Sequence, residues 1–278
     1  MASSSRILPR FDYRVDLAVE SVVGHVREKN EDALLVAPEL SLFALADGMG
    51  GLDSGEHASR EALTVVRAAI SEKSAQRLLE RFAATPTLAA RREVFAMLRN
   101  AVLRAHEHLL AEQERLAQRM GTTLDVCLCV RDKAFVAHVG DGRVFLARSS
   151  ATLQITEDHL VRGPLSVRRP SSGGVAPPRP LSSGLGLPSP LRVDVFVLDL
   201  VRGDTLLLCT DGAYGPLESE AAITDRNRAP VSAIVSTIIQ NSLQRGGRDN
   251  ASVIALRVEG RLIERPDHRT TDDMPTLE

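Results

Sequence analysis

The sequence predicts an α+β domain in which long helices cover antiparallel β-sheets, and two observations support this fold class. Apolar stretches of strand length come in pairs, with a short polar turn inside each pair. Segments with the helical period of apolar residues alternate with these pairs, at about 54–71, 87–118 and 229–245. The chain has 278 residues, of which 44% are hydrophobic, so its length suits one main domain with a sizeable core.

Three pairs of apolar stretches are expected to form β-hairpins, because β-branched and apolar residues at strand length are interrupted by turn formers. A further strand is expected at 251–258. The expected hairpins are 33–37 with 42–46, 123–130 with 134–140, and 193–200 with 205–209.

The turns of the first two hairpins indicate where their acidic residues lie. Residues that face each other across an antiparallel pair have a constant index sum, which the turn sets. A turn at 38–40 places Asp47 opposite about Asp32, and a turn near Asp132 places Asp141 opposite about Thr123. Each hairpin therefore carries its acids to the open end, away from the turn.

The ends of the chain and one internal segment are expected to lie outside the regular elements. Residues 1–10 are interpreted as an N-terminal tail, 11–260 as the domain, and 261–278 as a disordered polar tail. Residues 161–190 are rich in Pro, Gly, Ser and Arg. This segment is either a flexible surface loop or a flap that faces the substrate and attracts a phosphorylated protein. The arginines available for the second role are Arg162, Arg168, Arg169 and Arg179.

The composition excludes several classes of function. With 34 Lys+Arg against 36 Asp+Glu, the chain lacks the basic field that nucleic-acid binding usually needs. No run approaches the roughly 18 apolar residues of a membrane span, and the first residues lack a signal-peptide hydrophobic region. We therefore expect a cytoplasmic protein that contacts neither nucleic acid nor membrane. Its cysteines lie inside apolar runs and are expected to be buried and reduced: Cys127, Cys129 and Cys209.

Acidic residues gather at the ends of the expected strands. Carboxylates collected at one end of buried sheets repel one another unless protons or cations neutralise them. Oxygen donors suit hard ions such as Mg²⁺ or Mn²⁺, and a glycine after an aspartate lets its backbone carbonyl approach the ion. We therefore interpret Asp47, which Gly48 follows, as a metal ligand that can bridge two ions. The whole set is Glu31, Asp32, Asp47, Asp141, Asp211 and Asp249.

A basic residue close to these acids suggests what the metals act on. Two metals a few ångströms apart can hold a bridging hydroxide and stabilise charge on both sides of a displacement at phosphorus. Arg27 lies four residues before Glu31 and offers a planar fork for two phosphate oxygens. The alternative for Arg27 is a solvated or ion-paired side chain.

At this point a set of motifs resembles a known family, the metal-dependent protein serine/threonine phosphatases of the PP2C (PPM) type in their bacterial form. The motifs occur in the family's order and span about 24–258. They are GHVREKNED (24–32), ALADGMGG (44–51), GEHAS (55–59), GTT (121–123), VGDGRVF (139–145), ITEDH (155–159), LLLCTDG (206–212) and GGRDNASVI (246–254).

The resemblance implies a four-layer αββα sandwich, with two central antiparallel β-sheets flanked by helices and a binuclear metal centre at one end. It implies hydrolysis of phosphoserine and phosphothreonine on proteins by a metal-bridging hydroxide, opposite a serine/threonine kinase. By the family's pattern, Asp47 would bridge two Mn²⁺ or Mg²⁺ ions. Asp211 and Asp249 would complete one ion site, and Glu31 with the Gly48 carbonyl would complete the other. We expect a monomer.

Further roles are implied for three residues. Asp32 resembles the acid that holds metal-bound water, Arg27 the arginine that binds substrate phosphate, and Asp141 the acid that shares a weaker third metal with Asp211. Met49 stands where eukaryotic members have a histidine proposed as general acid. The segment 161–190 departs from the helical flap that the family's pattern implies, so substrate choice is the inference that transfers least.

Two alternatives belong to other functional classes. A pseudophosphatase would keep the fold as a binding or regulatory module without turnover, and its mark in the sequence would be a lost metal ligand. None of the implied ligands is missing. A two-metal hydrolase acting on nucleotides or another phosphoester is disfavoured, because the chain has no nucleotide-binding glycine loop.

Overall fold

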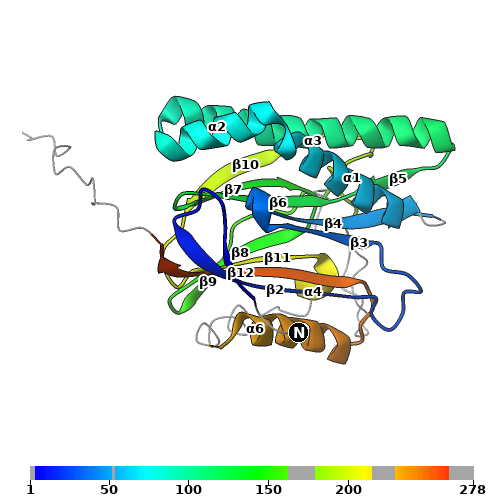
Figure 1. Ribbon diagram of the computed structural model, residues 1–278. Helices are drawn as coiled ribbons and strands as arrows, with labels where there is room; N and C mark the ends of the chain where they lie inside the picture. Colours follow the sequence, from blue (N-terminus) through cyan, green and yellow to red (C-terminus); the bar gives the residue numbers. More distant parts are fainter. Residues whose placement is uncertain (1–3, 52–53, 162–178, 215–228, 263–278) are drawn as a thin grey trace, which may run out of the picture.

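Two antiparallel β-sheets lie face to face between layers of helices, in a computed structural model that describes residues 4–51, 54–161, 179–214 and 229–262 (Figure 1). This arrangement is the predicted αββα sandwich. No helix in the described ranges is long and apolar enough to cross a membrane.

The first sheet contains six strands from both ends of the chain. Its central strand β12 pairs with β2 on one side and with β11 on the other. The strand order is β1 (Ser4–Ile7), β2 (Tyr13–Val22), β12 (Ala251–Arg261), β11 (Thr205–Cys209), β8 (Arg143–Arg148) and β9 (Ala151–Gln154).

The second sheet is built mainly from the two predicted hairpins. A short strand, β5 (Met120–Thr122), pairs with the last residues of β4. The strand order is β10 (Asp194–Asp199), β7 (Lys133–Val139), β6 (Leu124–Val130), β4 (Leu42–Gly50) and β3 (Asp32–Ala37), with the 3₁₀ turn η1 (Pro38–Leu40) between β3 and β4.

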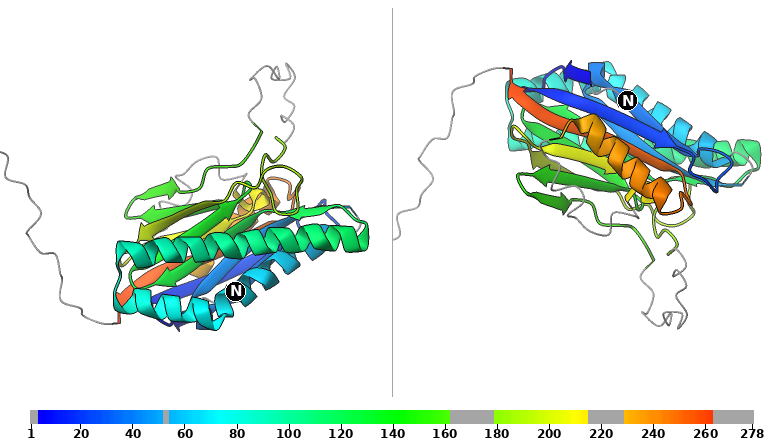
Figure 2. Two further views of the ribbon diagram at one scale, coloured as in Figure 1. Left: turned by 90° about the horizontal axis from the view of Figure 1, so that it is seen from above. Right: turned by 90° about the horizontal axis from the view of Figure 1, so that it is seen from below.

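Helices cover the outer face of each sheet (Figure 2). Three helices lie over the second sheet and one lies over the first, and buried side chains from each helix join the core of the sheet beneath it. The three are α1 (Ser54–Ser71), α2 (Lys73–Ala84) and α3 (Leu88–Leu116), and the one is α6 (Val231–Gln244); a single turn, α4 (Asp211–Tyr214), follows β11.

A third core cluster fills the space between the sheets. Its members include Phe43, Leu45, Cys127 and Leu208, all fully buried. The inner strands β4, β6, β7 and β11 are therefore covered on both faces, which explains why they read as continuous apolar runs and not as alternating ones. The three cysteines are buried and free, as predicted.

The register of the first two hairpins agrees with the predicted geometry. Asp32 pairs with Asp47 across β3 and β4, as the index sum indicated. In the second hairpin Leu124 pairs with Val139, so Asp141 lies just beyond the last pair of β6 and β7. The predicted helices also form, with bounds close to those expected.

The third predicted hairpin is wrong. The strand β10 pairs with β7 in the second sheet, whereas β11 pairs with β8 and β12 in the first. The turn at Gly203, which has a φ of +92°, therefore carries the chain from one sheet to the other. Two apolar runs of strand length on either side of a short turn look the same in either arrangement, so the sequence pattern could not distinguish a hairpin from a crossing between sheets.

Two further segments differ from expectation. Residues 4–7, assigned to a tail, form β1 and pair with β2, and the nearby Leu8 and Phe11 are buried in the core between the sheets. The helix α2 was not predicted. Residues 263–278 of the expected C-terminal tail, and residues 162–178 of the expected flap, lie outside the described ranges.

Candidate active site

The predicted acids meet at one end of the sandwich, and the strand pairing explains why. In the first sheet, Cys209 pairs with both Val253 and Arg143. The end of β11 therefore lies beside the beginnings of β12 and β8, at one end of the sheet. These connections carry the first sheet's acids to that end. The acids are Asp141, Asp211 and Asp249, and the second sheet supplies Asp32 and Asp47 opposite them.

Hydrogen bonds connect the two sheets at this end. The Thr210 hydroxyl donates to Asp32 Oδ2 at 3.0 Å. The Glu31 amide donates to Asn250 Oδ1 at 2.9 Å, and the Asn250 side-chain amide donates to the carbonyls of Val23 (2.9 Å) and Lys29 (2.8 Å). The sequence analysis missed these roles of Thr210 and Asn250. Their position directly beside Asp211 and Asp249 was the available signal.

The backbone of Asp47 is fixed by two threonines. Its amide donates to Thr123 Oγ1 at 2.9 Å. Its carbonyl accepts from the Thr122 hydroxyl and from the Thr123 amide, each at 2.9 Å. The side chain of Asp47 therefore extends from a backbone that is held on both sides.

Glycines allow the start of α1 to lie against the end of β4. A Cβ added to Gly48 would lie 2.0 Å from the carbonyl oxygen of Gly55 and 2.7 Å from that of Glu31. A Cβ added to Gly55 would lie 2.4 Å from Glu31 Oε1. Only glycine fits at both positions, and the result is that Glu31, Asp47 and the Gly48 backbone come close together.

Burial and neighbouring charge raise the pKa of four of the acids. Burial raises the pKa of Asp32 to about 7, with further increases from Asp211 and Asp249. Burial and the charge of Asp211 raise the pKa of Asp141 to about 7. Burial and the other carboxylates hold the pKa of Asp47 well above its usual value, and burial with Asp249 raises that of Asp211. The protein thus gathers negative charge where water is scarce.

The donor set fits a hard divalent cation. Asp32 Oδ1 and Asp211 Oδ1 are buried without a hydrogen-bond partner among the described residues, which is costly for a carboxylate unless a cation satisfies it. Among the described residues, no group of three or more His, Cys, Asp or Glu side chains is already arranged to hold a metal ion by itself. Hard cations also take backbone carbonyls and water, so the Gly48 carbonyl and solvent complete such a set.

Arg27 lies at the edge of the acid cluster. Its Nη2 donates to Asp249 Oδ2 at 2.8 Å, and this hydrogen bond raises the pKa of Arg27, with further increases from Glu31 and Asp47. The Arg27 side chain is 50% exposed, so the guanidinium still presents N–H groups to solvent beside the acids.

A comparison with family models supports the meaning of this geometry. The model described as protein phosphatase 2C matches residues 24–162, a stretch that contains Arg27, Glu31, Asp32, Asp47 and Asp141. The serine/threonine phosphatase stp of Listeria welshimeri is 30% identical over 252 residues, which cover 87% of this chain and 94% of that protein. The chain belongs to the protein phosphatase 2C family.

Other relatives of this phosphatase 2C chain are similar over most of its length. The serine/threonine protein phosphatase PstP of Mycobacterium tuberculosis is 28% identical over 87% of this chain and 44% of its own length. A crystal structure of that phosphatase has a TM-score of 0.70 at 26% identity, covering 88% of this chain and 99% of that one. A structure of the PstP catalytic domain in complex with two manganese ions has a TM-score of 0.68.

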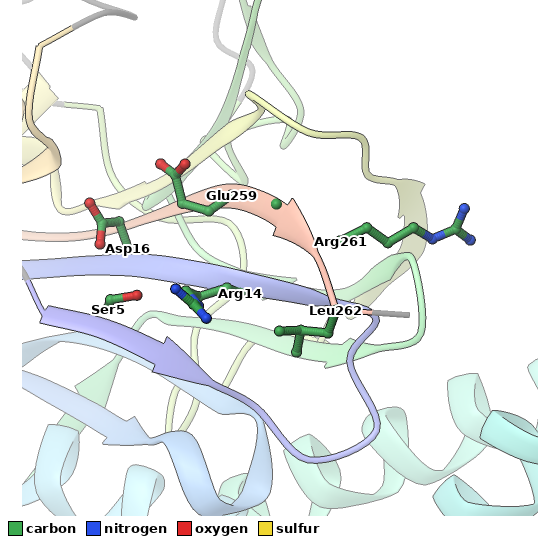
Figure 3. Close-up of a pocket in the computed structure, with 7 residues that line it drawn as sticks. Ser5, Arg14, Asp16, Glu259, Arg261 and Leu262 are labelled. Carbon is green, nitrogen blue, oxygen red and sulfur yellow. The ribbon is translucent and has the colours of Figure 1, made fainter. Parts of the chain in front are cut away.

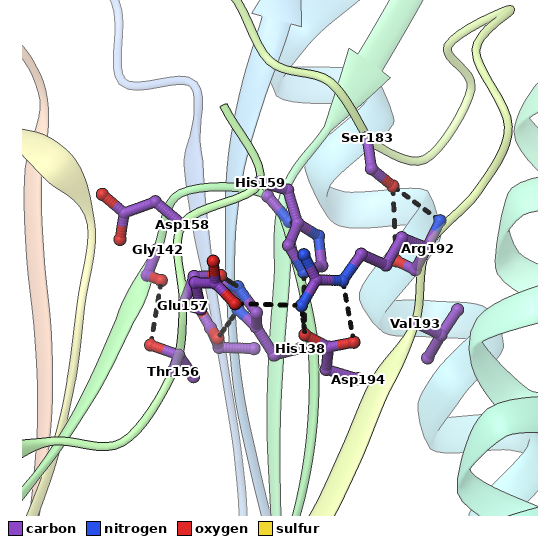
Figure 4. Close-up of polar contacts among 12 residues, drawn as sticks. His138, Gly142, Thr156, Glu157, Asp158, His159, Ser183, Arg192, Val193 and Asp194 are labelled. Atoms are coloured by element: carbon purple, nitrogen blue, oxygen red, sulfur yellow. Dashed lines mark hydrogen bonds and ion pairs between the residues drawn. The ribbon is translucent and has the colours of Figure 1, made fainter. Parts of the chain in front are cut away.

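The phosphatase also contains a polar network around His138 and His159, next to Gly142 (Figure 4). His138 Nδ1 lies 2.7 Å from Asp125 Oδ1, and His138 Nε2 lies 3.1 Å from the Glu157 carbonyl. The Glu157 carbonyl is an acceptor, so Nε2 donates to it, and Nδ1 pairs with the Asp125 carboxyl. Burial lowers the pKa of His138, but Asp125 and the Glu157 carbonyl raise it by more, so it lies above its usual value. Beside it, His159 Nδ1 accepts from the Gly140 amide at 3.2 Å, which makes His159 neutral.

This network joins the loop that contains Asp141 to the segment that begins at residue 179. His159 Nε2 bonds to Asp194 Oδ2 at 3.1 Å, and Arg192 donates to both oxygens of Asp194. On the other side, Asp125 Oδ2 lies 2.0 Å from where a Cβ on Gly142 would be. The sequence analysis did not predict this network.

A pocket lies at the end of the phosphatase that is opposite to the acid cluster (Figure 3). It has a volume of about 510 Å³ and is lined by the last residues of β12 and by β1 and β2. The acid cluster lies at the first residue of β12, and this strand has 11 residues, so the pocket is far from the acids. Its labelled residues are Ser5, Arg14, Asp16, Glu259, Arg261 and Leu262.

Proposed function

We propose that this chain hydrolyses phosphoserine and phosphothreonine on proteins, with Mn²⁺ or Mg²⁺ as its cofactor. The observation that carries the proposal is the group of buried acids that both sheets deliver to one edge, beside an exposed arginine. The names of the relatives and the two manganese ions in the PstP complex support it.

The residues that would hold the cations come from both sheets. Asp47 and the Gly48 carbonyl belong to the second sheet, and Glu31 precedes it. Asp211 follows β11 of the first sheet, and Asp249 precedes β12. When bound, a pair of such ions supplies a water-derived nucleophile and offsets charge on the phosphoryl oxygens. Substrate binding and orientation depend on the chain's own side chains.

Arg27 would bind the substrate phosphate. Its guanidinium is anchored to Asp249 by one nitrogen, so its other N–H groups are free to take two phosphate oxygens in the fork geometry that phosphate prefers. Anchoring through Asp249 also fixes the arginine relative to the acids, which orients the phosphate against them.

Asp32 and Asp141 would act from the edge of the site. Asp32 accepts a hydrogen bond from the Thr210 hydroxyl, which fixes its carboxyl beside the other acids, where it would orient a water molecule. In the metal-free fold, burial raises its pKa to about 7. Asp141, whose pKa burial also raises to about 7, would share a further cation with Asp211.

The partners of the enzyme follow from this activity. Its substrates are phosphoproteins, and we propose that they are products of a serine/threonine kinase. The three buried, free cysteines support a reducing, cytoplasmic environment. The monomeric state stays a prediction, which light scattering of the purified protein tests.

The first experiment measures hydrolysis of para-nitrophenyl phosphate and of a phosphothreonine peptide, with and without Mn²⁺. We expect turnover that depends on the metal and falls at least about 100-fold in Asp47→Asn and in Asp211→Asn, since each variant removes a cation ligand. Asp199→Asn is the matched control, because Asp199 is exposed at the end of β10 and outside the acid cluster.

The alternative of binding without turnover makes the opposite forecast. A folded protein that binds phosphopeptides but releases no phosphate at any Mn²⁺ concentration would contradict the proposal. So would full activity in a double variant of Asp47 and Asp211. Within the described residues each predicted acid is present at the shared edge, so nothing observed favours the alternative.

A further inference from the structure

An apolar groove begins immediately beside the acid cluster. It has a volume of about 390 Å³, and we name it the Met49 groove after the residue nearest the site. Met49 follows Gly48 directly, and strand alternation places the side chains of Asp47 and Met49 on the same face of β4. The groove is also lined by Leu110, Arg119, Met120, Leu187 and Pro188.

Hydrogen bonds hold the walls of the groove in place. Gln113 Nε2 donates to the Gly186 carbonyl at 2.7 Å, and the Gly186 amide donates to His106 Nδ1 at 3.1 Å. Thr122 and Leu185 exchange backbone hydrogen bonds at 3.0 and 2.9 Å. The segment around Gly186 is thus tied to both α3 and β5, so the groove is formed before any ligand arrives.

The groove leaves apolar surface and one cation exposed. Leu110 is 38% exposed on α3, and Met49 is partly exposed. Arg119 is exposed at the rim and forms no ion pair within the described ranges. The groove therefore offers an apolar ligand a surface to bury and an acidic neighbour a charge to pair with.

We propose that the Met49 groove binds an apolar side chain of the phosphoprotein substrate, within two residues of the phosphorylated serine or threonine, and that Arg119 favours an acidic residue beside it. This inference rests on the proposed function. An extended peptide and the strand β4 have the same rise, roughly 3.3 Å per residue, so a peptide whose phosphate sits at Asp47 reaches the groove one or two residues away. The occupant is thus a specific part of the substrate.

The test compares phosphothreonine peptides that carry Leu or Asn, one at a time, at the two positions on either side of the phosphoresidue. We expect kcat/KM to be about tenfold or more higher for Leu at one of these positions, as for other apolar pockets. No preference at any of the four positions would overturn the proposal.

A pair of helix variants assigns the preference to the groove. Leu110→Glu places a charge on the groove wall and should abolish the preference for Leu. Leu103→Glu is the matched control: Leu103 is 37% exposed on the same helix and does not line the groove, so this variant should keep the preference. Equal behaviour of the two variants would contradict the proposal.

Charge reversal at the rim gives an independent test. Arg119→Glu should change a preference for Asp over Lys beside the apolar residue into the reverse. Arg92→Glu makes the same change of net charge on an exposed residue of α3 outside the groove and should leave the preference intact. An unaltered preference in Arg119→Glu would remove Arg119 from the proposal.

Hydrolysis of para-nitrophenyl phosphate separates the two proposals, because this substrate has no peptide to fill the groove. The two variants outside the groove, Leu103→Glu and Arg92→Glu, should keep wild-type turnover of it, and far-UV circular dichroism shows whether all four variants fold. If the wild-type protein turns over neither this compound nor the phosphothreonine peptides, the proposed function fails. The groove is then tested by fluorescence polarisation with the same phosphopeptides, where equal affinity for the Leu and Asn peptides would overturn it.

Discussion

At the scale of the residue, the site depends on backbone approaches that only glycine permits. Gly48→Ala would place a Cβ 2.0 Å from the Gly55 carbonyl oxygen, whereas a Cβ on Gly51 meets no atom within 4 Å. We expect Gly48→Ala to lower the free energy of unfolding by about 1–3 kcal/mol, because backbone must shift. Gly51→Ala should change it by less than about 0.5 kcal/mol.

Urea unfolding of the two glycine variants checks this expectation. Phosphatase activity should fall in Gly48→Ala and stay in Gly51→Ala, since the shift in the first variant separates Glu31 from the end of β4. Equal stability of the two variants would show that α1 is not held as closely to β4 as the contacts indicate.

The raised acid pKa values at the site give a pH dependence with a definite sign. Asp32 and Asp141 each have a pKa of about 7 in the folded protein against an ordinary value of 3.8. Between these values the folded state binds more protons than the unfolded state, so stability is lost as pH rises through this window. We expect the metal-free protein to have a lower Tm at pH 8 than at pH 6.

Thermal melts in EDTA at the two pH values measure this difference. Asp32→Asn removes one of the titrating carboxyls, so its Tm should depend less on pH. A wild-type Tm that rises from pH 6 to pH 8 would mean that these acids are not charged and crowded in the metal-free fold.

At the scale of the element, the polar network positions the loop between β7 and β8. Among the described residues, His159 is the only side chain that forms a hydrogen bond with the Gly140 amide. It also bonds to Asp194 at the start of β10. His159→Phe keeps the ring volume but leaves both groups without this partner. We expect it to lower the free energy of unfolding by about 1–3 kcal/mol.

The matched control for this variant is His57→Phe. His57 pairs with Glu112 between α1 and α3, and its side chain is 36% exposed, so its loss should cost less than about 1 kcal/mol. Urea unfolding compares the two. The His159 variant should also displace the loop that carries Asp141, so its kcat should depend less on Mn²⁺ concentration than that of the wild type. An unchanged dependence would limit His159 to a packing role.

At the scale of the whole molecule, the site joins the two sheets. Its acids come from both, so cations that bind them hold the sandwich closed at one end. We expect Mn²⁺ to raise the Tm at pH 8, by an amount that corresponds to about 2.7 kcal/mol when its concentration is 100 times Kd. Differential scanning calorimetry across a range of Mn²⁺ concentrations measures the rise.

A variant separates binding from a general effect of salt. Asp211→Asn removes one buried carboxylate, so the metal-free variant should be more stable than the metal-free wild type and should gain less from Mn²⁺. Equal gains in the two proteins would place the stabilising ions elsewhere.

The sequence by itself determined the family, the fold class and the acids that meet at the site. Strand-length apolar runs ending at Asp47 and Asp141 fixed two hairpins, because the index sum across a tight turn is local information. The periodicity of α1, α3 and α6 was equally local.

Only the tertiary structure decided which strands share a sheet and which groups surround the acids. The stretches 194–199 and 205–209 belong to different sheets, and their apolar runs carry no pattern that identifies the partner strand of each. The bonds of Asn250 to Val23 and Lys29, and the bond of Thr210 to Asp32, depend on residues distant in the chain. Such contacts form when separate elements pack together, so no single stretch of sequence specifies them.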